Sequence, residues 1–288
     1  MAVSGSIAEQ LAPPSPELAA VEERLRADIA SHRLKLPVLP NVAMEVLSSS
    51  LDDGQDAARL AGLVQKDQSL ATHMLRIVNS PAFRGATEIV ALQQAIARLG
   101  MVRIREIALT ASLKNAMSCK GSFQELMDDA WRLGLATGMW AKEFARATRR
   151  NVENAYLGGL LHNIGDSLIA VELCTREPGL REGDARYLMA VLGREAGETL
   201  TAAWQLPPLI GTCIRYVGHF AEADANQDDV ASVECGHAAA VAMLQDTLSA
   251  ETLVQLDAVQ HLNLYPEDVE DVLTKSAEIN VALESMVL

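Results

Sequence analysis

The amino-acid sequence predicts an all-α protein made of two packed helical bodies. Hydrophobic residues make up 49% of the 288 residues and aromatic residues only 4%, so Leu, Ala, Val, Ile and Met must form the core. This set of residues favours helices over β-sandwiches and β-barrels. Apolar residues recur at helical spacing along most of the chain. No segment of useful length alternates apolar and polar residues with period two, which is the pattern expected of a strand.

Prolines, glycines and serines divide the chain into parts. Residues 1–16 contain two consecutive prolines and a Ser-Pro pair, and we expect them to be a flexible leader. Residues 17–117 are expected to form the first helical body and residues 123–288 the second, which ends in acidic helices. The segment Ser118–Ser122 between them is the best candidate for a linker.

The helices of the first body are predicted from apolar periodicity and from the residues that interrupt it. Pro37 and Pro40 lack amide donors and fix their own φ, so no helix continues through residues 36–40. Asn41 and Ser69 are expected to cap the helices that follow, and Gly100 stands where a helix commonly ends. Helices are therefore expected over about 17–34, 41–49, 56–65, 69–78, 91–99 and 101–117.

The second body shows the same periodicity in longer segments. Its last helix is expected to begin at Pro266, because proline is favoured at the first helical position. The other helices are expected over about 123–149, 154–164, 166–175, 184–204, 208–220, 229–248 and 250–262.

Charge is distributed unevenly along the chain. The net charge is −14, which argues against nucleic acid as a partner because phosphate binding needs a positive field. Residues 98–150 carry ten basic and five acidic side chains, whereas residues 222–288 carry fourteen acidic and one basic. These runs are either solvated helix faces that attract each other or an acidic docking face for a basic partner. The sequence leaves both interpretations open.

The cysteines and the apolar segments indicate the cellular compartment in which the protein is expected. The four cysteines show no C-x-x-C spacing, which predicts reduced thiols in a cytoplasmic protein and no disulfide or zinc framework. The start of the sequence does not resemble a signal peptide, and no uncharged stretch is long enough to span a membrane. The cysteines are Cys119, Cys174, Cys213 and Cys235.

The common catalytic motifs are absent from the sequence. It contains no G-x-S-x-G, no G-x-x-x-x-G-K-[ST] and no H-E-x-x-H. No two histidines lie three or four residues apart, so a metal site would have to combine distant segments. One apolar segment, residues 157–165, carries His162 and Asn163 just before Gly165. The pair Gly158-Gly159 in this segment is expected to allow close helix packing.

Residues 157–165 resemble the G-L-L-H-D-I-G signature of the HD superfamily, whose His-Asp pair binds divalent metal for phosphohydrolysis. Further motifs resemble one branch of that superfamily, the HDOD (HD-related output domain) family. These motifs lie in the same order at residues 36–40, 67–80, 94–100 and 204–207. Their matching positions, with those of the signature, are Pro37, Pro40, Asp67, Asn79, Ser80, Leu99, Gly100, Gly159, Gly165, Trp204 and Pro207.

The resemblance also shows where the metal ligands of an HD hydrolase are missing. Asn163 stands in place of the aspartate, and the other ligand positions fall on Leu133, Arg194 and Gly218, so that His162 and His219 remain. An amide lacks the charge of a carboxylate and an arginine repels a cation. We therefore expect no catalytic residue, no metal and no cofactor.

The retained polar residues then have a structural interpretation. His162 and Asn163 are expected to join neighbouring helices through buried hydrogen bonds. Asn79 and Ser80 are expected to cap the end of a helix. The second body is thus predicted to be a degenerate HD-like domain.

The resemblance implies a non-catalytic bacterial signalling module that acts through protein contacts, made by the groove between its two bodies or by the acidic tail. The implied partners are sensor kinases, receiver domains or cyclic-dinucleotide enzymes in two-component or related pathways. Three alternatives stay open: a nucleotide sensor, a nucleic-acid binder using residues 98–150, and a phosphohydrolase. The atypical metal site of that phosphohydrolase would combine His162, His219 and His237 with Asp166 or Glu195. The sequence does not predict the oligomeric state.

Overall fold

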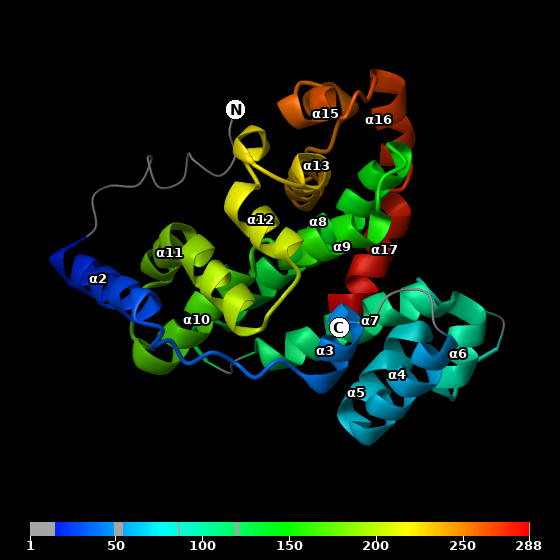
Figure 1. The fold of residues 1–288 in the computed structure, drawn as a ribbon, viewed down its shortest axis with the longest axis horizontal. Helices are drawn as coiled ribbons and strands as arrows, with labels where there is room; N and C mark the ends of the chain where they lie inside the picture. Colours follow the sequence, from blue (N-terminus) through cyan, green and yellow to red (C-terminus); the bar gives the residue numbers. More distant parts are fainter. Residues whose placement is uncertain (1–14, 49–53, 86, 119–120, 288) are drawn as a thin grey trace. The chain divides into compact units, whose positions relative to one another are not determined.

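The computed structural model describes residues 15–48, 54–85, 87–118 and 121–287, which form helices joined by short connections, with no strand among them (Figure 1). The all-α prediction is confirmed. The chain divides into two compact units. One unit contains residues 1–36 and 118–276, and the other contains residues 37–117 and 277–288. No described helix is long and apolar enough to cross a bilayer.

The smaller unit is built around one central helix, α7, which contacts α3, α5 and α6. Ile104, Ile107 and Ala108 of α7 are fully buried. The last helix of the chain, α17, belongs to this unit from residue 277 onward. The helices are α3 (Asn41–Ser48), α4 (Gly54–Lys66), α5 (Gln68–Val78), α6 (Leu92–Leu99), α7 (Met101–Ala116) and α17 (Ser276–Val287).

The larger unit is organised around α8, a long helix packed between α9 and α13. A second pair, α10 and α11, packs closely together, and α12 contacts both α9 and α11. The helices are α2 (Pro16–Ala30), α8 (Gln124–Ala147), α9 (Val152–Leu161), α10 (Ile164–Arg176), α11 (Glu182–Ala203), α12 (Pro208–Tyr216), η1 (Phe220–Glu222), α13 (Gln227–Leu244), α14 (Ala250–Leu253), α15 (Asp257–His261) and α16 (Pro266–Leu273).

The division of the chain differs from the expected one at both ends. Residues 17–36 group with the larger unit, because α2 packs on α11. The final residues group with the smaller unit, where the carbonyl of Val287 accepts a hydrogen bond from Lys114. The expected linker begins where the chain passes between the units, after Met117. Residues 119–120 of this linker, which include Cys119, lie outside the described part of the chain. Residues 1–14 of the expected leader also lie outside it.

Several expected helix ends are wrong for local reasons. Ser15 and Pro16 do not belong to a leader, because the Ser15 side chain caps α2 and Pro16 is its first residue. Asp67, not Ser69, caps α5 by accepting a hydrogen bond from the backbone N–H of Leu70 at 3.0 Å. Asn41 is the first helical residue of α3. The helix expected over 250–262 is divided into α14 and α15.

Candidate functional site: the junction of α8, α9 and α13

The HD-like signature lies where α9 ends and α10 begins. Asn151 starts α9 by accepting hydrogen bonds from the backbone N–H groups of Glu153 and Asn154, each at 3.0 Å. The helix ends at Leu161, and the chain turns at His162 and Asn163 before α10. The two polar residues therefore stand at a bend between two largely buried helices.

Glycines bring the backbones of α8 and α9 into contact at this bend. A Cβ atom on Gly159 would lie 2.6 Å from the Cα atom of Gly138 on α8. A Cβ atom on Gly134 would lie 2.8 Å from the carbonyl oxygen of Leu160. Only glycine permits such an approach without displacing backbone. The expectation that glycines allow close packing here is confirmed, and the close approach places the end of α9 within hydrogen-bond distance of α8.

His162 connects α9 to α13 through its two ring nitrogens. Nδ1 lies 2.7 Å from the carbonyl oxygen of Gly159, and Nε2 lies 3.1 Å from Nδ1 of His237 on α13. A carbonyl oxygen only accepts, so Nδ1 of His162 carries the proton and Nε2 carries the lone pair. Nδ1 of His237 must then donate to that lone pair. The only lone pair of the neutral His162 ring is therefore used by another protein side chain.

The environment keeps both imidazoles neutral. Burial and repulsion by His237 lower the pKa of His162 to about 3. Burial lowers the pKa of His237 to about 4. The rings meet in an edge-to-face arrangement with centroids 5.0 Å apart. The hydrogen bond between the two rings requires at least one of them to be neutral, because two imidazolium rings would each present only donors.

Asn163 connects the same bend to α8. Its Nδ2 donates to the carbonyl oxygen of Ala130 at 2.7 Å. Its Oδ1 lies against Gly134, where a Cβ atom would be 2.7 Å away. The expectation that His162 and Asn163 join neighbouring helices is confirmed, and each residue joins a different helix.

The first turn of α10 is held against α11 by a second glycine contact. A Cβ atom on Gly165 would lie 1.8 Å from the carbonyl oxygen of Gly193. A Cβ atom on Gly193 would lie 1.8 Å from Oδ1 of Asp166. Burial raises the pKa of Asp166 to about 7, so its carboxyl group favours the protonated form far more than an exposed aspartate does.

The other positions expected around a metal lie on α8, on α11 and in the segment after α12. Glu234 accepts hydrogen bonds from the backbone N–H groups of Gly218 and Phe220, which holds the segment that carries His219. Burial raises the pKa of Glu234, and the hydrogen bonds from Phe220 and Gly218 oppose that rise. Glu195 binds Arg26 of α2. Two further positions lie on long helices, with partly buried Leu133 on α8 and exposed Arg194 on α11.

His237, the hydrogen-bond partner of His162, is not one of the HD-like motif positions. It lies 75 residues from His162 along the chain, so no local pattern connects the two. The one sequence signal is its place after Gly236, in an otherwise alanine-rich helix. A Cβ atom on Gly236 would lie 2.5 Å from the backbone nitrogen of Ala141, so this glycine marks the face of α13 that meets α8.

The residues at this junction do not fit the divalent metal of an HD hydrolase. His162 offers no free lone pair, Asn163 is neutral, and burial raises the pKa of the Asp166 carboxyl group to about 7. A divalent ion needs several anionic or imidazole donors directed at one point. No group of three or more His, Cys, Asp and Glu side chains within the described ranges is arranged to hold a metal ion.

In the smaller unit, motif positions lie at the ends of helices. Asn79 ends α5, and its side chain bonds the carbonyl oxygens of Leu75 and Ile89 through Nδ2 and the N–H of Ile89 through Oδ1, at 2.8–2.9 Å. Gly100, after Leu99, ends α6 with a φ of +79° that favours glycine. The helix-end interpretation is confirmed for Asn79 and wrong for the Ser80 side chain, whose buried Oγ has no hydrogen-bond partner among the described residues. Pro37 and Pro40 lie in the non-helical segment before α3.

Replacing Asn79 with alanine is expected to destabilise the smaller unit by about 2–3 kcal/mol, because three hydrogen bonds are lost and the backbone of Ile89 is left without partners. Replacing Ser80 with alanine is the matched control, since its buried Oγ has no partner among the described residues. This change is expected to alter stability by less than about 0.5 kcal/mol. Denaturant unfolding followed by far-ultraviolet circular dichroism measures both. Equal losses in the two variants would contradict the interpretation of Asn79.

The junction is expected to lose stability as the pH falls below about 6.5. In that range the unfolded chain protonates both histidines, whereas the folded pKa values of about 3 and 4 keep them neutral. At these two positions the unfolded state then binds more protons than the folded state, so the histidine pair lowers the free energy of unfolding by roughly 4–5 kcal/mol between pH 6.5 and pH 4.5. The raised pKa of Asp166 acts in the opposite direction and offsets part of this loss, because its folded carboxyl group takes up a proton in the same range. A His237→Gln variant should show a shallower pH slope in urea unfolding. An unchanged slope would rule out the pair as its source.

The last motif lies between α11 and α12. Trp204 follows α11 and donates its backbone N–H to the carbonyl oxygens of Ala202 and Leu200. Pro207 precedes α12, and Pro208 is the first residue of that helix. This stretch therefore forms the turn that places α12 against α9 and α11.

Comparison with solved structures shows the same fold. An HDOD domain protein of unknown function from Geobacter sulfurreducens matches 93% of this chain and 99% of its own length, with a TM-score of 0.72 and 20% identity. A protein from Shewanella amazonensis SB2B, provisionally named a metal-dependent phosphohydrolase, matches 94% of this chain and all of its own length, with a TM-score of 0.70 and 18% identity. A provisionally named signal transduction protein from Marinobacter aquaeolei VT8 matches 98% of this chain and 69% of its own length, with a TM-score of 0.61 and 18% identity.

Comparison of sequences gives the family. An uncharacterized protein of Treponema pallidum (strain Nichols) is 23% identical over 223 residues, which cover 73% of this chain and 43% of that protein. The chain therefore spans less than half of that relative. The model of the HDOD domain family matches residues 36–220. This match covers more than half of the chain and includes all the motif positions described above, so the protein belongs to the HDOD domain family.

Proposed function

We propose that this protein is a non-catalytic regulatory module of bacterial signal transduction that acts through protein–protein contacts. The observation that carries the proposal is the use of the HD-like signature. Nε2 of His162 is bonded to Nδ1 of His237, and Nδ2 of Asn163 donates to the carbonyl oxygen of Ala130. The His162 lone pair that would coordinate a metal already accepts a hydrogen bond from another helix, so it does not coordinate a metal for phosphate-ester hydrolysis.

The names of similar proteins support a regulatory role without deciding the chemistry. The Marinobacter protein is provisionally named for signal transduction, and the Shewanella protein for phosphohydrolysis. The donor chemistry of the junction favours the first of these roles for this chain. Sensor kinases, receiver domains and cyclic-dinucleotide enzymes are the partners we propose.

A phosphodiesterase assay tests the non-catalytic part of the proposal. Purified protein is incubated with Mn²⁺ and bis(p-nitrophenyl) phosphate, beside the His162→Ala variant and a protein-free blank. We expect the wild type, the variant and the blank to release p-nitrophenolate at the same rate. Mn²⁺-dependent release by the wild type that disappears in His162→Ala would establish a hydrolase instead.

Cross-linking in the native bacterium tests the protein-contact part. We expect one specific protein to be recovered and to bind the purified chain directly. Recovery of no direct binder would contradict the proposal. A variant of α16 that neutralises the exposed acids Glu267, Glu270 and Asp271 then separates the two interpretations of the acidic tail. Slower association of this variant, steepest at low salt, indicates a docking face, and unchanged association indicates a solvated helix.

A further inference from the structure

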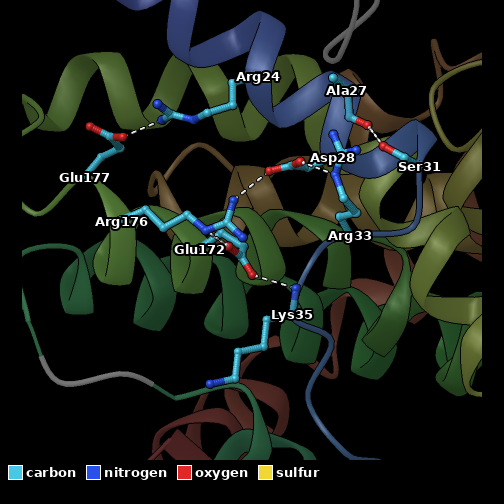
Figure 2. A network of polar contacts seen from close by, with 9 residues as sticks. All are labelled: Arg24, Ala27, Asp28, Ser31, Arg33, Lys35, Glu172, Arg176 and Glu177. Atoms are coloured by element: carbon cyan, nitrogen blue, oxygen red, sulfur yellow. Dashed lines mark hydrogen bonds and ion pairs between the residues drawn. The ribbon is translucent and has the colours of Figure 1, made fainter.

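Two of the three segments that connect the units are attached to the same end of α10. The chain enters the smaller unit at residue 37 and returns to the larger unit at residue 118. Before the first crossing, the backbone N–H of Lys35 donates to the carboxylate of Glu172 on α10 at 2.9 Å (Figure 2). After the second, the hydroxyl of Ser122 donates to the carbonyl oxygen of Pro178, just beyond the end of α10, at 2.8 Å.

The attachment of the first segment is part of an ionic network (Figure 2). Glu172 is only 3% exposed, and its second carboxylate oxygen lies 3.0 Å from Nε of Arg176. Nη1 of Arg176 also lies 2.6 Å from one carboxylate oxygen of Asp28 on α2. Nε of Arg33 lies 3.0 Å from the other oxygen of Asp28. The chain from α2 to Lys35 is thus fixed on the last turns of α10 at several points.

The second segment is attached by backbone packing as well as by its hydrogen bond. A Cβ atom on Gly121 would lie 2.7 Å from Sγ of Cys174 on α10, so the missing side chain lets the backbone lie against the helix. The third connection, at residue 277, follows α16, which contacts α8 and α14. The end of α10 therefore holds two of the three connections, and α16 precedes the third.

The other end of α10 belongs to the junction described above. The helix begins after Asn163, whose side chain is bonded to α8, and Gly165 in its first turn lies against Gly193 of α11. One continuous helix of 13 residues joins this end to the attached segments. A regular helix moves as one body, because each turn is hydrogen-bonded to the next. A displacement of the first turn of α10 is therefore carried to the two connecting segments.

We propose that α10 couples the junction of α8, α9 and α13 to the smaller unit, with its last turns acting as a clamp on the two connecting segments. With the clamp closed, all three connections restrain the smaller unit. When the first turn of α10 shifts, the clamp opens and the smaller unit turns about the connection at residue 277, which is a hinge motion. This coupling goes beyond the proposed function, because it holds whichever partner the protein binds.

Double electron–electron resonance between spin labels on the two units tests the clamp. The labels are attached to azide-bearing residues introduced at two exposed helical positions, Thr72 of α5 and Ala147 of α8. The clamp variant carries Glu172→Leu and Ser122→Ala, which remove the polar atoms that hold the two segments. The matched control is Glu198→Ala, which breaks an ion pair between α11 and α12.

We expect a narrow distance distribution in the wild type and in Glu198→Ala, and one about twice as wide in the clamp variant, because a released unit samples hinge motion. Gly165→Ala should also widen the distribution, although the clamp residues are intact. An unchanged width in the clamp variant, or equal widening in Glu198→Ala, would overturn the clamp. An unchanged width in Gly165→Ala would overturn the coupling.

A second label pair within the larger unit, at Ala147 and the exposed Gln260 of α15, separates motion between units from loss of fold. Its distance distribution should keep the same width in every variant. Where it widens, a milder change repeats the test. Ser122→Ala at an exposed position replaces the clamp variant, and Asn163→Ala, which removes one hydrogen bond to α8, replaces Gly165→Ala. The same outcomes then support or overturn the proposal.

Discussion

Replacing Gly165 with alanine is expected to lower the free energy of unfolding of the larger unit by about 3 kcal/mol. The new Cβ atom would lie 1.8 Å from the carbonyl oxygen of Gly193 and 2.5 Å from the backbone nitrogen of Gly197. Both are backbone atoms of α11 and cannot rotate away. The helices α10 and α11 must therefore separate, which loosens the apolar contacts between them.

Urea unfolding followed by tryptophan fluorescence measures this effect, because all three tryptophans lie in the larger unit. Gly183→Ala is the matched control. Gly183 lies in the first turn of α11, where a Cβ atom would meet nothing within 4 Å. This change is expected to leave stability unchanged or to raise it by up to about 1 kcal/mol, because alanine is the better helix former. A Gly165→Ala variant as stable as the control would show that α10 and α11 do not approach so closely.

Replacing Asn163 with aspartate, which restores the HD sequence, is expected to destabilise the protein by about 3 kcal/mol at neutral pH. The change removes the donor that bonds the carbonyl oxygen of Ala130 at 2.7 Å. It places two acceptor oxygens against each other and introduces a charge beside α8. The loss should shrink near pH 5, because a protonated carboxyl group can donate to the same carbonyl oxygen.

The matched control for this change is Asn263→Asp, which makes the same change in charge at an exposed position of the same unit. It is expected to alter stability by less than about 0.5 kcal/mol. Both variants are unfolded in urea at pH 7.5 and pH 5, with and without Mn²⁺. Mn²⁺ is expected to leave the loss in Asn163→Asp unchanged. Recovery of stability in Mn²⁺ would mean that the junction still accepts a metal once the carboxylate is restored.

The sequence predicts the helices of this fold well because their signals are local. Apolar periodicity marks each helix, and Gly100 stands in the expected helix-ending position with the positive φ that favours glycine there. The errors come from choices between neighbouring residues, such as Asp67 and Ser69 as the cap of α5. The grouping of α2 with α10 and α11 was missed because it rests on ion pairs between residues about 150 positions apart.

In the candidate site too, the sequence predicts the local features but not the partners that are remote in sequence. The glycine contacts and the tying role of His162 and Asn163 follow from one segment of sequence and are confirmed. The identity of each partner does not follow from that segment. His237 and Ala130 are brought to the bend by the packing of α13 and α8, which depends on the whole larger unit.

The tautomeric state of His162 tests most directly the claim that its polar atoms serve helix packing. Imidazole ¹⁵N spectra at pH 7 should show His162 protonated at Nδ1, with Nε2 accepting a hydrogen bond from Nδ1–H of His237. Addition of one equivalent of Zn²⁺ should leave both resonances in place. A proton on Nε2 of His162, or a shift of its resonances at stoichiometric Zn²⁺, would contradict the account.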